Sequence, residues 1–165
     1  MKILYAIQGT GNGHISRAKE LIPYLQSYGE VDFLFSGKTA TIDFPVDIKY
    51  RFNGLSLYYN SYGSLSYCDT FRKNSIKETL KITKELPVEK YDLIINDFEF
   101  ITALACKLKK KSSIHFGHQA SFQSNKVPKP KATYYFQELI LKHFAQAEKY
   151  IGLHFMKYDN FILPP

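Results

Sequence analysis

Three glycines and a histidine within six residues form the stretch of this sequence with the clearest chemical character. In order, the stretch is Gly9, Thr10, Gly11, Asn12, Gly13 and His14. Glycine lets a ligand approach the backbone closely, and the free N–H groups that begin a helix attract an anion or a polar sugar. We therefore predict that residues 9–13 bind substrate and that the histidine does chemistry beside them.

His14 is suited to act as a general base at this position. The partial positive charge of a helix N-terminus disfavours an imidazolium, and a neutral imidazole can take a proton from a hydroxyl nucleophile. Asp97 follows another apolar run and could orient His14 and stabilise the imidazolium that forms. Two alternatives stay open: Glu99 as the acid, and Asp97 as the N-cap of a helix that begins at Phe98.

The elements around these residues alternate between strand and helix. Apolar runs of strand length occur at 3–7, 31–35, 91–96, 113–116 and 149–153, and alternation predicts a half-exposed strand at 46–52. Helices are predicted from His14 to about 27, from Asp69 or Thr70 to 86, at 98–108 and at 131–146. Strand, helix and strand with a short return make parallel pairs. The pattern predicts an α/β fold, a Rossmann-like open parallel sheet of six or seven strands with helices on both faces.

In such sheets, ligands bind outside the carboxyl ends of the strands. The glycine stretch, Asp97 and a loop at 117–124 each follow a predicted strand, so they should share that edge. A tyrosine-rich stretch at 57–67 has no period and predicts a long loop. This loop either folds onto its own tyrosines or closes over substrate.

Several familiar sites are excluded by spacing. A dinucleotide fingerprint needs a differently placed third glycine and an acid after the second strand, which ends in Phe35 and Ser36. A P-loop ending at Gly37–Thr39 would need a glycine where Asp32 stands, and there is no G-x-S-x-G. The two cysteines form no CxxC or His/Cys cluster, so we expect no metal site and a reducing compartment.

Composition favours one domain with an anionic partner. The 165 residues carry a net charge of +7, which suits a phospholipid surface, a phosphorylated substrate or nucleic acid, or is simply a Lys-rich surface. No RRM, KH or helix-turn-helix pattern is found, which disfavours nucleic acid. No signal peptide is recognised, and no apolar stretch approaches the roughly 20 residues that span a bilayer. We expect a cytoplasmic protein, at most peripheral at the inner membrane face.

Two segments resemble a known family. Residues 9–18, from Gly9 to Ala18, resemble the N-terminal loop of GT-B glycosyltransferases, in particular the peptidoglycan lipid-intermediate N-acetylglucosaminyltransferases and the diacylglycerol glycosyltransferases. Their loop reads Gly-Gly-Thr-Gly-Gly-His, and Gln8 and Asn12 replace two of those glycines. Residues 114–121 are similar to the segment where a strand of the family turns into an acceptor-side loop, which implies acceptor contacts for His118 and Gln119.

The resemblance implies a two-domain enzyme of which this chain is one half. Residues 1–158 would be the N-terminal acceptor domain, and 159–165 the start of the interdomain linker, with the C-terminal donor-binding domain missing. The implied reaction is inverting hexosyl transfer from a nucleotide sugar, most simply a UDP-sugar, to a sugar or lipid-linked acceptor. The chain alone would be inactive and would hold no cofactor. The alternative is a non-catalytic nucleotide- or phosphate-binding Rossmann-like module.

Overall fold

The computed structural model describes residues 1–10, 12–37, 44–55, 75–128 and 135–165. Within them, one parallel sheet has the strand order β3-β2-β1-β4-β5-β6-β7. Its strands are β1 (Lys2–Gln8), β2 (Glu30–Ser36), β3 (Tyr50–Phe52), β4 (Leu93–Asp97), β5 (Ile114–Gly117), β6 (Lys149–Leu153) and β7 (Ile162–Leu163).

The strand order places the topological switch between β1 and β4. From β1 the chain moves outward through β2 and β3, and it then returns to add β4 on the other side. Ile7 is aligned with Phe35 of β2 on one side and with Asp97 of β4 on the other. Because the strands are parallel and in register, their carboxyl ends meet at one edge, and the switch point there is the usual ligand site of such sheets.

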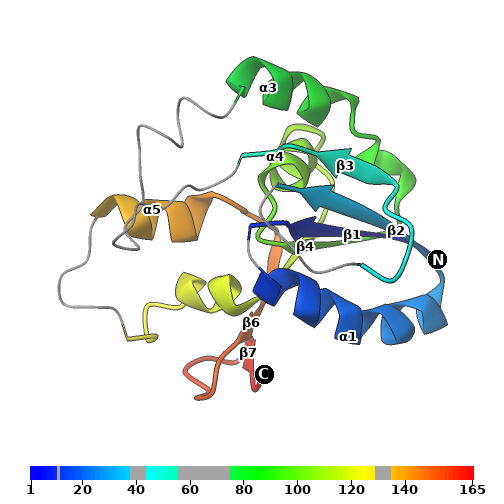
Figure 1. The fold of residues 1–165 in the computed structure, drawn as a ribbon. Coiled ribbons are helices and arrows are strands. Elements are labelled where there is room, and N and C mark those ends of the chain that lie inside the picture. The colour runs from blue at the N-terminus through cyan, green and yellow to red at the C-terminus, as the bar shows by residue number, and fades with distance from the viewer. Residues whose placement is uncertain (11, 38–43, 56–74, 129–134) are drawn as a thin grey trace.

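Helices cover both faces of the sheet, as the alternation of apolar runs predicts. Helix α1 (Asn12–Tyr28) lies below the strands in Figure 1, and α3 (Ile76–Glu85) lies above them. Tyr5 and Ile7 of β1 belong to the core on the α1 side. Leu4 and Ala6 belong to the core that also contains residues of α4 (Phe100–Leu108). A strand with both faces buried is largely apolar, as residues 3–7 of β1 are. The predicted fold class is confirmed.

Among the described residues, three smaller helical elements occur in the second half of the chain. They are the 3₁₀ helices η1 (Val88–Lys90) and η2 (His118–Gln123), and the helix α5 (Tyr135–His143). Phe144, directly after α5, packs on Phe98 with ring centroids 5.0 Å apart. The third apolar cluster therefore lies next to the end of β4.

Several predicted elements differ in extent. The strand predicted at 46–52 is confined to Tyr50–Phe52, which pairs with Leu34–Ser36. Val46 and Ile48 pack against the α1-side core, so their alternation reflects core contact rather than sheet pairing. The predicted loop at 117–124 contains the helical turns of η2. β7 was not predicted, and it lies within the expected linker 159–165.

Helix α3 begins later than the sequence predicts. The described helix α3 begins at Ile76, and the Ser75 side chain accepts the N–H of Glu78 as its N-cap. Asp69, Thr70 and the tyrosine-rich stretch 57–67 lie outside the described residues, as do residues 131–134 of the helix predicted at 131–146. No helix in the described ranges is both long and apolar enough to cross a membrane.

Candidate functional site

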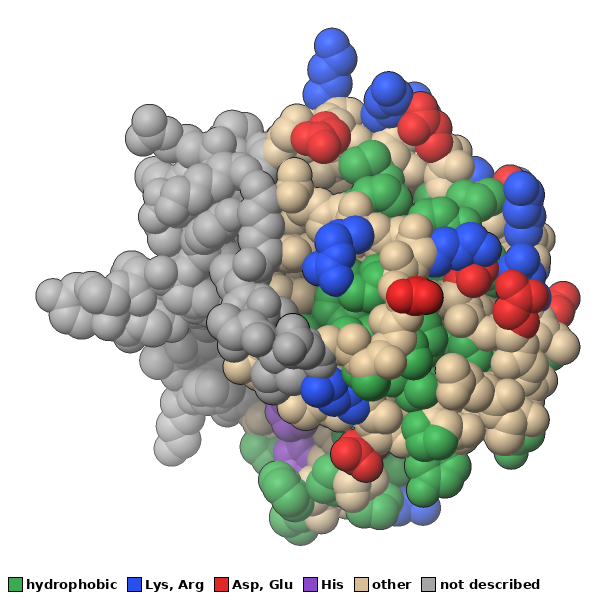
Figure 2. All heavy atoms as spheres, turned by 45° about the vertical axis from the view of Figure 1, so that its right-hand side comes forward, with side chains coloured by type: hydrophobic (Ala, Val, Ile, Leu, Met, Phe, Trp, Pro, Cys, Tyr) green, Lys and Arg blue, Asp and Glu red, His purple; other side chains and the backbone are tan. Residues whose placement is uncertain are grey.

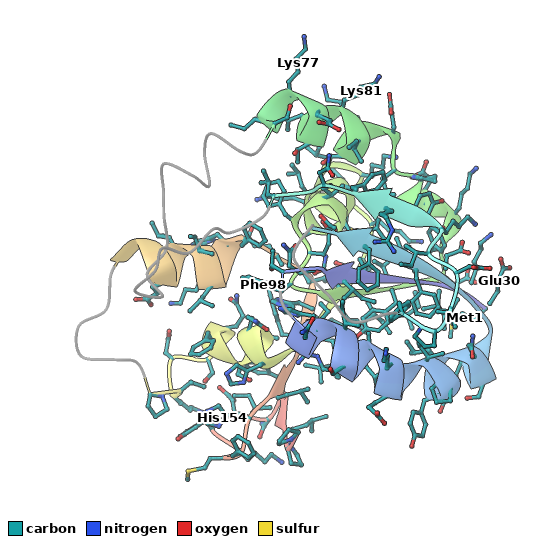
Figure 3. All side chains as sticks on the ribbon, in the orientation of Figure 1. Met1, Glu30, Lys77, Lys81, Phe98 and His154 are labelled. Atoms are coloured by element: carbon teal, nitrogen blue, oxygen red, sulfur yellow. The ribbon has the colours of Figure 1, made fainter. Side chains whose placement is uncertain are left out.

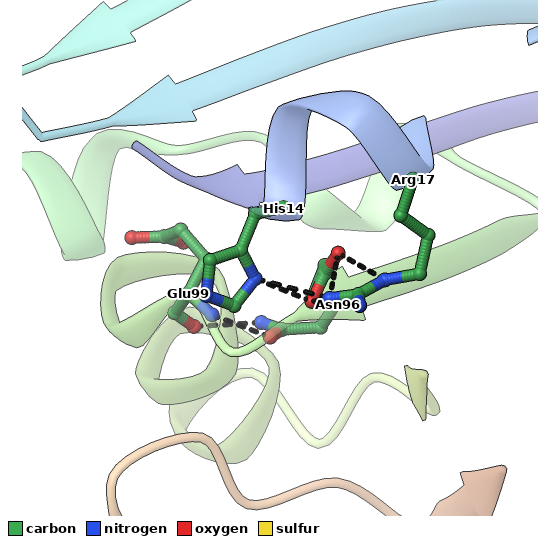
Figure 4. Close-up of polar contacts among 5 residues, drawn as sticks. His14, Arg17, Asn96 and Glu99 are labelled. Carbon is green, nitrogen blue, oxygen red and sulfur yellow. Dashed lines mark hydrogen bonds and ion pairs between the residues drawn. The ribbon is translucent and has the colours of Figure 1, made fainter. Parts of the chain in front are cut away.

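The site predicted at the carboxyl edge is assembled from β1, β4, β5 and the start of α1. Figure 3 shows Phe98 at this edge, whereas Met1 and Glu30 lie at the opposite, amino edge. His14 and Arg17 are three residues apart on α1, so they share one face of the helix. In Figure 4 both side chains turn toward a carboxylate at the end of β4.

That carboxylate is Asp97, and it makes four close contacts. His14 Nδ1 lies 2.8 Å from Asp97 Oδ1. Arg17 Nε donates to Oδ2 at 3.0 Å, and Arg17 Nη2 donates to Oδ1 at 2.6 Å and to Oδ2 at 2.8 Å. A two-point guanidinium–carboxylate contact fixes both orientation and distance. The structure thus brings the two predicted catalytic residues together and adds an arginine that the sequence reasoning did not use.

The charges of this cluster determine the tautomer of His14. Asp97 has no exposed surface. Burial acts to raise its pKa, but the hydrogen bond from His14 and the charge of Arg17 outweigh it, so the pKa is lowered. An ionised carboxylate only accepts hydrogen bonds, so the shared proton belongs to His14 Nδ1. The other ring nitrogen, Nε2, then carries a lone pair and can accept a proton from a substrate.

The turn after β4 decides which acid points at the histidine. Asn96 Nδ2 donates to the Glu99 carbonyl at 2.7 Å, and the Glu99 N–H donates to Asn96 Oδ1 at 2.8 Å. Between them Phe98 has a φ of 57°, a left-handed conformation that costs roughly 1–2 kcal/mol for a side chain of this kind. Backbone strain of this sort is concentrated at functional sites.

Glu99, the rival acid, has a structural role. Its carboxylate accepts the N–H groups of Ile101 at 2.8 Å and of Thr102 at 2.6 Å, which makes Glu99 the N-cap of α4. The alternative of Asp97 as N-cap is therefore wrong, and the helix begins at Phe100 rather than Phe98. Because Glu99 caps the helix, Asp97 is free to bind His14 and Arg17.

Gly117 closes the site from β5. Its φ is 136°, and a Cβ there would lie 2.9 Å from Asp97 Oδ1 and 3.1 Å from Arg17 Nη2. Any side chain would therefore clash with the ion pair. The sequence reasoning placed this glycine at the correct edge but assigned it no role.

Two buried rings complete the surroundings. The Tyr5 hydroxyl is buried beside Asp97 and has no well-formed hydrogen bond to any described residue, and burial followed by the Asp97 charge raises its pKa. The His115 ring lies between Phe98 and Tyr150, each with its centroid 5.9 Å away. Neither His115 nitrogen has a hydrogen-bond partner among the described residues, and burial lowers the pKa of His115 from 6.5 to about 4.

The glycine stretch divides into a packed part and an open part. The Gly9 N–H donates to the Ser36 carbonyl at 2.7 Å, and a Cβ at Gly9 would touch that oxygen at 3.4 Å. Gly13 is exposed, and a Cβ there would meet nothing within 4 Å. Thr10 is half-buried and Asn12 is exposed at the start of α1, whereas Gly11 lies outside the described residues. Among the described residues of the stretch, the outer ones, Asn12 and Gly13, are therefore exposed to a ligand.

His118 and Gln119 belong to η2, beyond the end of β5. His118 Nδ1 donates to the Leu153 carbonyl at 3.0 Å, and its ring stacks on His154 at 5.9 Å. Gln119 Oε1 is buried without a hydrogen-bond partner in the described ranges. Both lie at the predicted edge, but the described contacts do not join them to the His14–Asp97 pair.

Metal chemistry finds no support in the described part of the chain, where no group of three His, Cys, Asp or Glu side chains could hold an ion. Cys106 is buried and free, and burial raises its pKa to about 11, which keeps it a thiol at neutral pH.

Sequence reasoning missed Arg17, Gly117 and His115. The His14–Arg17 spacing was a usable signal, because residues at i and i+3 share a helix face. Gly117 and His115 gave no local signal, since their roles depend on the pairing of β5 beside β4.

Comparison with solved structures finds MurG of Acinetobacter baumannii, with 15% sequence identity and a TM-score of 0.38. The match covers 70% of this chain and 34% of that one, so this chain spans about a third of the length of MurG. A search of the curated proteins finds no match. A family model for glycosyl transferase family 1 matches residues 1–160, which include every strand of the sheet except its short last one. The chain belongs to glycosyl transferase family 1.

Proposed function

We propose that this chain is the N-terminal, acceptor-binding part of an inverting glycosyltransferase that uses a sugar nucleotide, with His14 as the general base. The observation that carries the proposal is the 2.8 Å contact between His14 Nδ1 and the buried Asp97 carboxylate. It directs the lone pair of Nε2 away from the carboxylate, where an acceptor hydroxyl can reach it.

The transfer has simple atom and charge balance. The acceptor oxygen attacks the anomeric carbon as its proton passes to His14 Nε2. The bond from that carbon to the diphosphate oxygen breaks on the opposite face, and the nucleoside diphosphate leaves with the electron pair. Asp97 stabilises the imidazolium without taking the proton, because the hydrogen bond from His14 and the charge of Arg17 keep the carboxylate ionised despite its burial.

The open end of the glycine stretch is where acceptor or donor phosphate would bind. Gly13 is exposed at the first turn of α1, and the N–H groups of such a turn favour negative charge. Thr10, Asn12 and, from η2, His118 and Gln119 are proposed to contact the acceptor. No metal is needed for this chemistry, because backbone dipoles can stabilise the leaving diphosphate.

Residues 1–158 are proposed as the acceptor domain, with 159–165 leading toward a donor-binding domain. In this proposal, UDP-sugar binds mainly on that second domain, and residues 1–165 alone transfer nothing. β7 lies in the 159–165 segment and pairs with β6.

A lipid-linked acceptor would bring the protein to an anionic membrane face in the cytoplasm. The charge of +7 supports this. On the face turned forward in Figure 2, however, Lys and Arg side chains stand beside Asp and Glu side chains. Attraction on that face would be weak and salt-sensitive, as between any mixed surface and a membrane.

The test is a transfer assay on the complete gene product with UDP-, GDP- and dTDP-sugars and a lipid extract as acceptor. His14→Ala should lower kcat by about 10²–10⁴-fold, the usual contribution of a general base. His143→Ala is the matched control, because His143 is exposed on α5. NMR of the product should show inverted anomeric configuration.

The outcomes separate the two candidate functions. Transfer that survives in His14→Ala at the wild-type rate would remove His14 as the base. A complete product that binds nucleotide but transfers to no acceptor would favour the non-catalytic binding module.

A further inference from the structure

A cavity at the amino edge of the sheet lies away from the site described above. It has a volume of about 460 Å³ and opens where α4 leads into β5 and where the chain enters β6. Its lining includes Lys107, Lys110, Lys111, Gln146, Glu148 and Tyr150. Asp97 and His14 are at the carboxyl edge, so the cavity is a separate feature. Its volume falls in the range of small-molecule sites.

The cavity carries an excess of positive charge. Three lysines line it and Glu148 is the single acid among its lining residues. Lys107 Nζ donates to Gln146 Oε1 at 3.1 Å and so joins the two walls. The ammonium groups of Lys110 and Lys111 have no ion pair or hydrogen bond in the described part of the chain. These two are available to an incoming anion.

Stabilisation of the C-terminal end of α4 does not explain why both Lys110 and Lys111 are present. The adjacent Lys109 donates to the Leu86 carbonyl at 2.7 Å and pairs with Glu89 at 3.0 Å. The carbonyls of the last turn are also occupied. The Lys111 N–H donates to the Cys106 carbonyl at 2.9 Å, and the Lys109 N–H donates to the Ala105 carbonyl at 3.0 Å.

Lys110 occupies a position that favours glycine. Its φ is 52°, and the bond from Lys111 N–H to the Cys106 carbonyl closes the helix around it in a Schellman arrangement. A left-handed residue with a Cβ costs about 1 kcal/mol or more relative to glycine. The sequence places an unpaired cation at the cavity where the backbone would be more stable without a side chain.

We infer that this cavity binds a phosphate-bearing molecule through Lys110 and Lys111, with Lys107 as a third contact held by Gln146. Lysine binds phosphate as a flexible point charge. The cavity volume leaves room for more than the phosphate group, and Tyr150 offers a ring wall. The inference is independent of the proposed glycosyl transfer, because the two sites share no residue.

The test is an NMR titration of the 165-residue chain with inorganic phosphate and with pyrophosphate. Amide shifts should be concentrated at residues 110–113 and 146–150. Lys110→Gly should weaken binding by about tenfold, as loss of a charge-assisted contact does. Because glycine suits the left-handed backbone, this variant should fold at least as well as the wild type. Lys77→Ala on α3 removes the same charge, and Figure 3 shows Lys77 pointing away from the molecule.

A second arm identifies the source of the phosphate. Vesicles of phosphatidylcholine with and without phosphatidylglycerol are mixed with the wild type and Lys110→Gly, and co-sedimentation is measured. Binding to the anionic vesicles that Lys110→Gly loses and that pyrophosphate competes away assigns a lipid headgroup. Binding of soluble phosphate alone assigns a free ligand. The inference is overturned if no shifts occur at the cavity and no vesicles bind, or if Lys77→Ala weakens binding as much as Lys110→Gly.

Discussion

At the carboxyl edge of the sheet, the Asp97 carboxylate has no exposed surface and two basic side chains in contact with it. At the amino edge, Lys110 and Lys111 line an open cavity with no ion pair among the described residues. The first charge is buried and must be compensated inside the protein, since an unpaired buried charge costs several kcal/mol. The ammonium groups of Lys110 and Lys111 stay hydrated, so their lack of an ion pair costs little stability.

The two edges also use left-handed backbone differently. Gly117 has a φ of 136° beside a crowded ion pair, where a Cβ would clash. Lys110 has a φ of 52° beside open space, where its side chain projects without a clash but at a cost in backbone strain. The carboxyl edge is therefore organised before any ligand arrives, whereas the amino edge is available to one.

The largest effect should come from breaking the buried pair. Asp97→Ala leaves Arg17 and His14 without their shared carboxylate and should lower the free energy of unfolding by about 3–5 kcal/mol. Urea unfolding measures this, with the exposed Asp47→Ala as control, which should change stability by less than about 0.5 kcal/mol. A loss below about 1 kcal/mol for Asp97→Ala would mean that the pair is not formed.

The next largest effect is a loss of stability at acid pH that His115 should cause. It is neutral when folded and has a pKa of about 4, whereas the unfolded side chain takes up a proton below 6.5. The unfolded state therefore binds more protons between these values, and stability should fall by about 3 kcal/mol as pH drops from 6.5 to 4.

His115→Phe should remove this contribution and keep the ring contacts with Phe98 and Tyr150. Stability at pH 7 should not fall, because no hydrogen bond is lost. Thermal unfolding between pH 7 and 4 measures the difference between the two proteins. An unchanged acid dependence in His115→Phe would contradict the assignment.

Gly117→Ala tests the crowding of the carboxyl edge. The added Cβ should push against Asp97 and Arg17 and, with the strained φ, should cost roughly 1–3 kcal/mol. Gly13→Ala is its counterpart, because a Cβ there meets nothing and alanine favours the helix. If both variants lost equal stability by urea unfolding, crowding at Gly117 would not be the cause.

The smallest effect has the opposite sign and lies at the amino edge. Lys110→Gly should raise the free energy of unfolding by about 1 kcal/mol, because glycine adopts the left-handed conformation without strain. Differential scanning calorimetry in buffer without phosphate measures it. A lower melting temperature would show that the Lys110 side chain stabilises the chain even without a ligand.

Much of the scaffold could be predicted because its signals are local. Each signal is formed by residues that are close together in the chain. These signals are the apolar runs of β1, β2 and β4, the amphipathic pattern of α1 and the helix stop at Gly29. The parallel order of β1, α1 and β2 follows from the short return between them. Boundaries were less accurate where a core contact imitated a strand, as at Val46 and Ile48.

The site was predicted only in part, because local signals do not show which residues meet in the folded protein. Because the glycine stretch, His14 and Asp97 each follow an apolar run predicted as a parallel strand, the sequence implies that they share one edge of the sheet. The choice between Asp97 and Glu99 depended on the left-handed Phe98 and on the bonds between Asn96 and Glu99, which no spacing rule foretells.

The alternation of strands and helices and the position of the glycine stretch and His14 at the start of α1 can be read from the sequence, because they follow from local periodicity and spacing. The position of β5 beside β4, which makes Gly117 face Asp97, and the lysine-lined cavity between α4 and the approach to β6 are visible only in the folded structure. These contacts join residues distant in the chain, and their geometry follows from how the whole sheet packs.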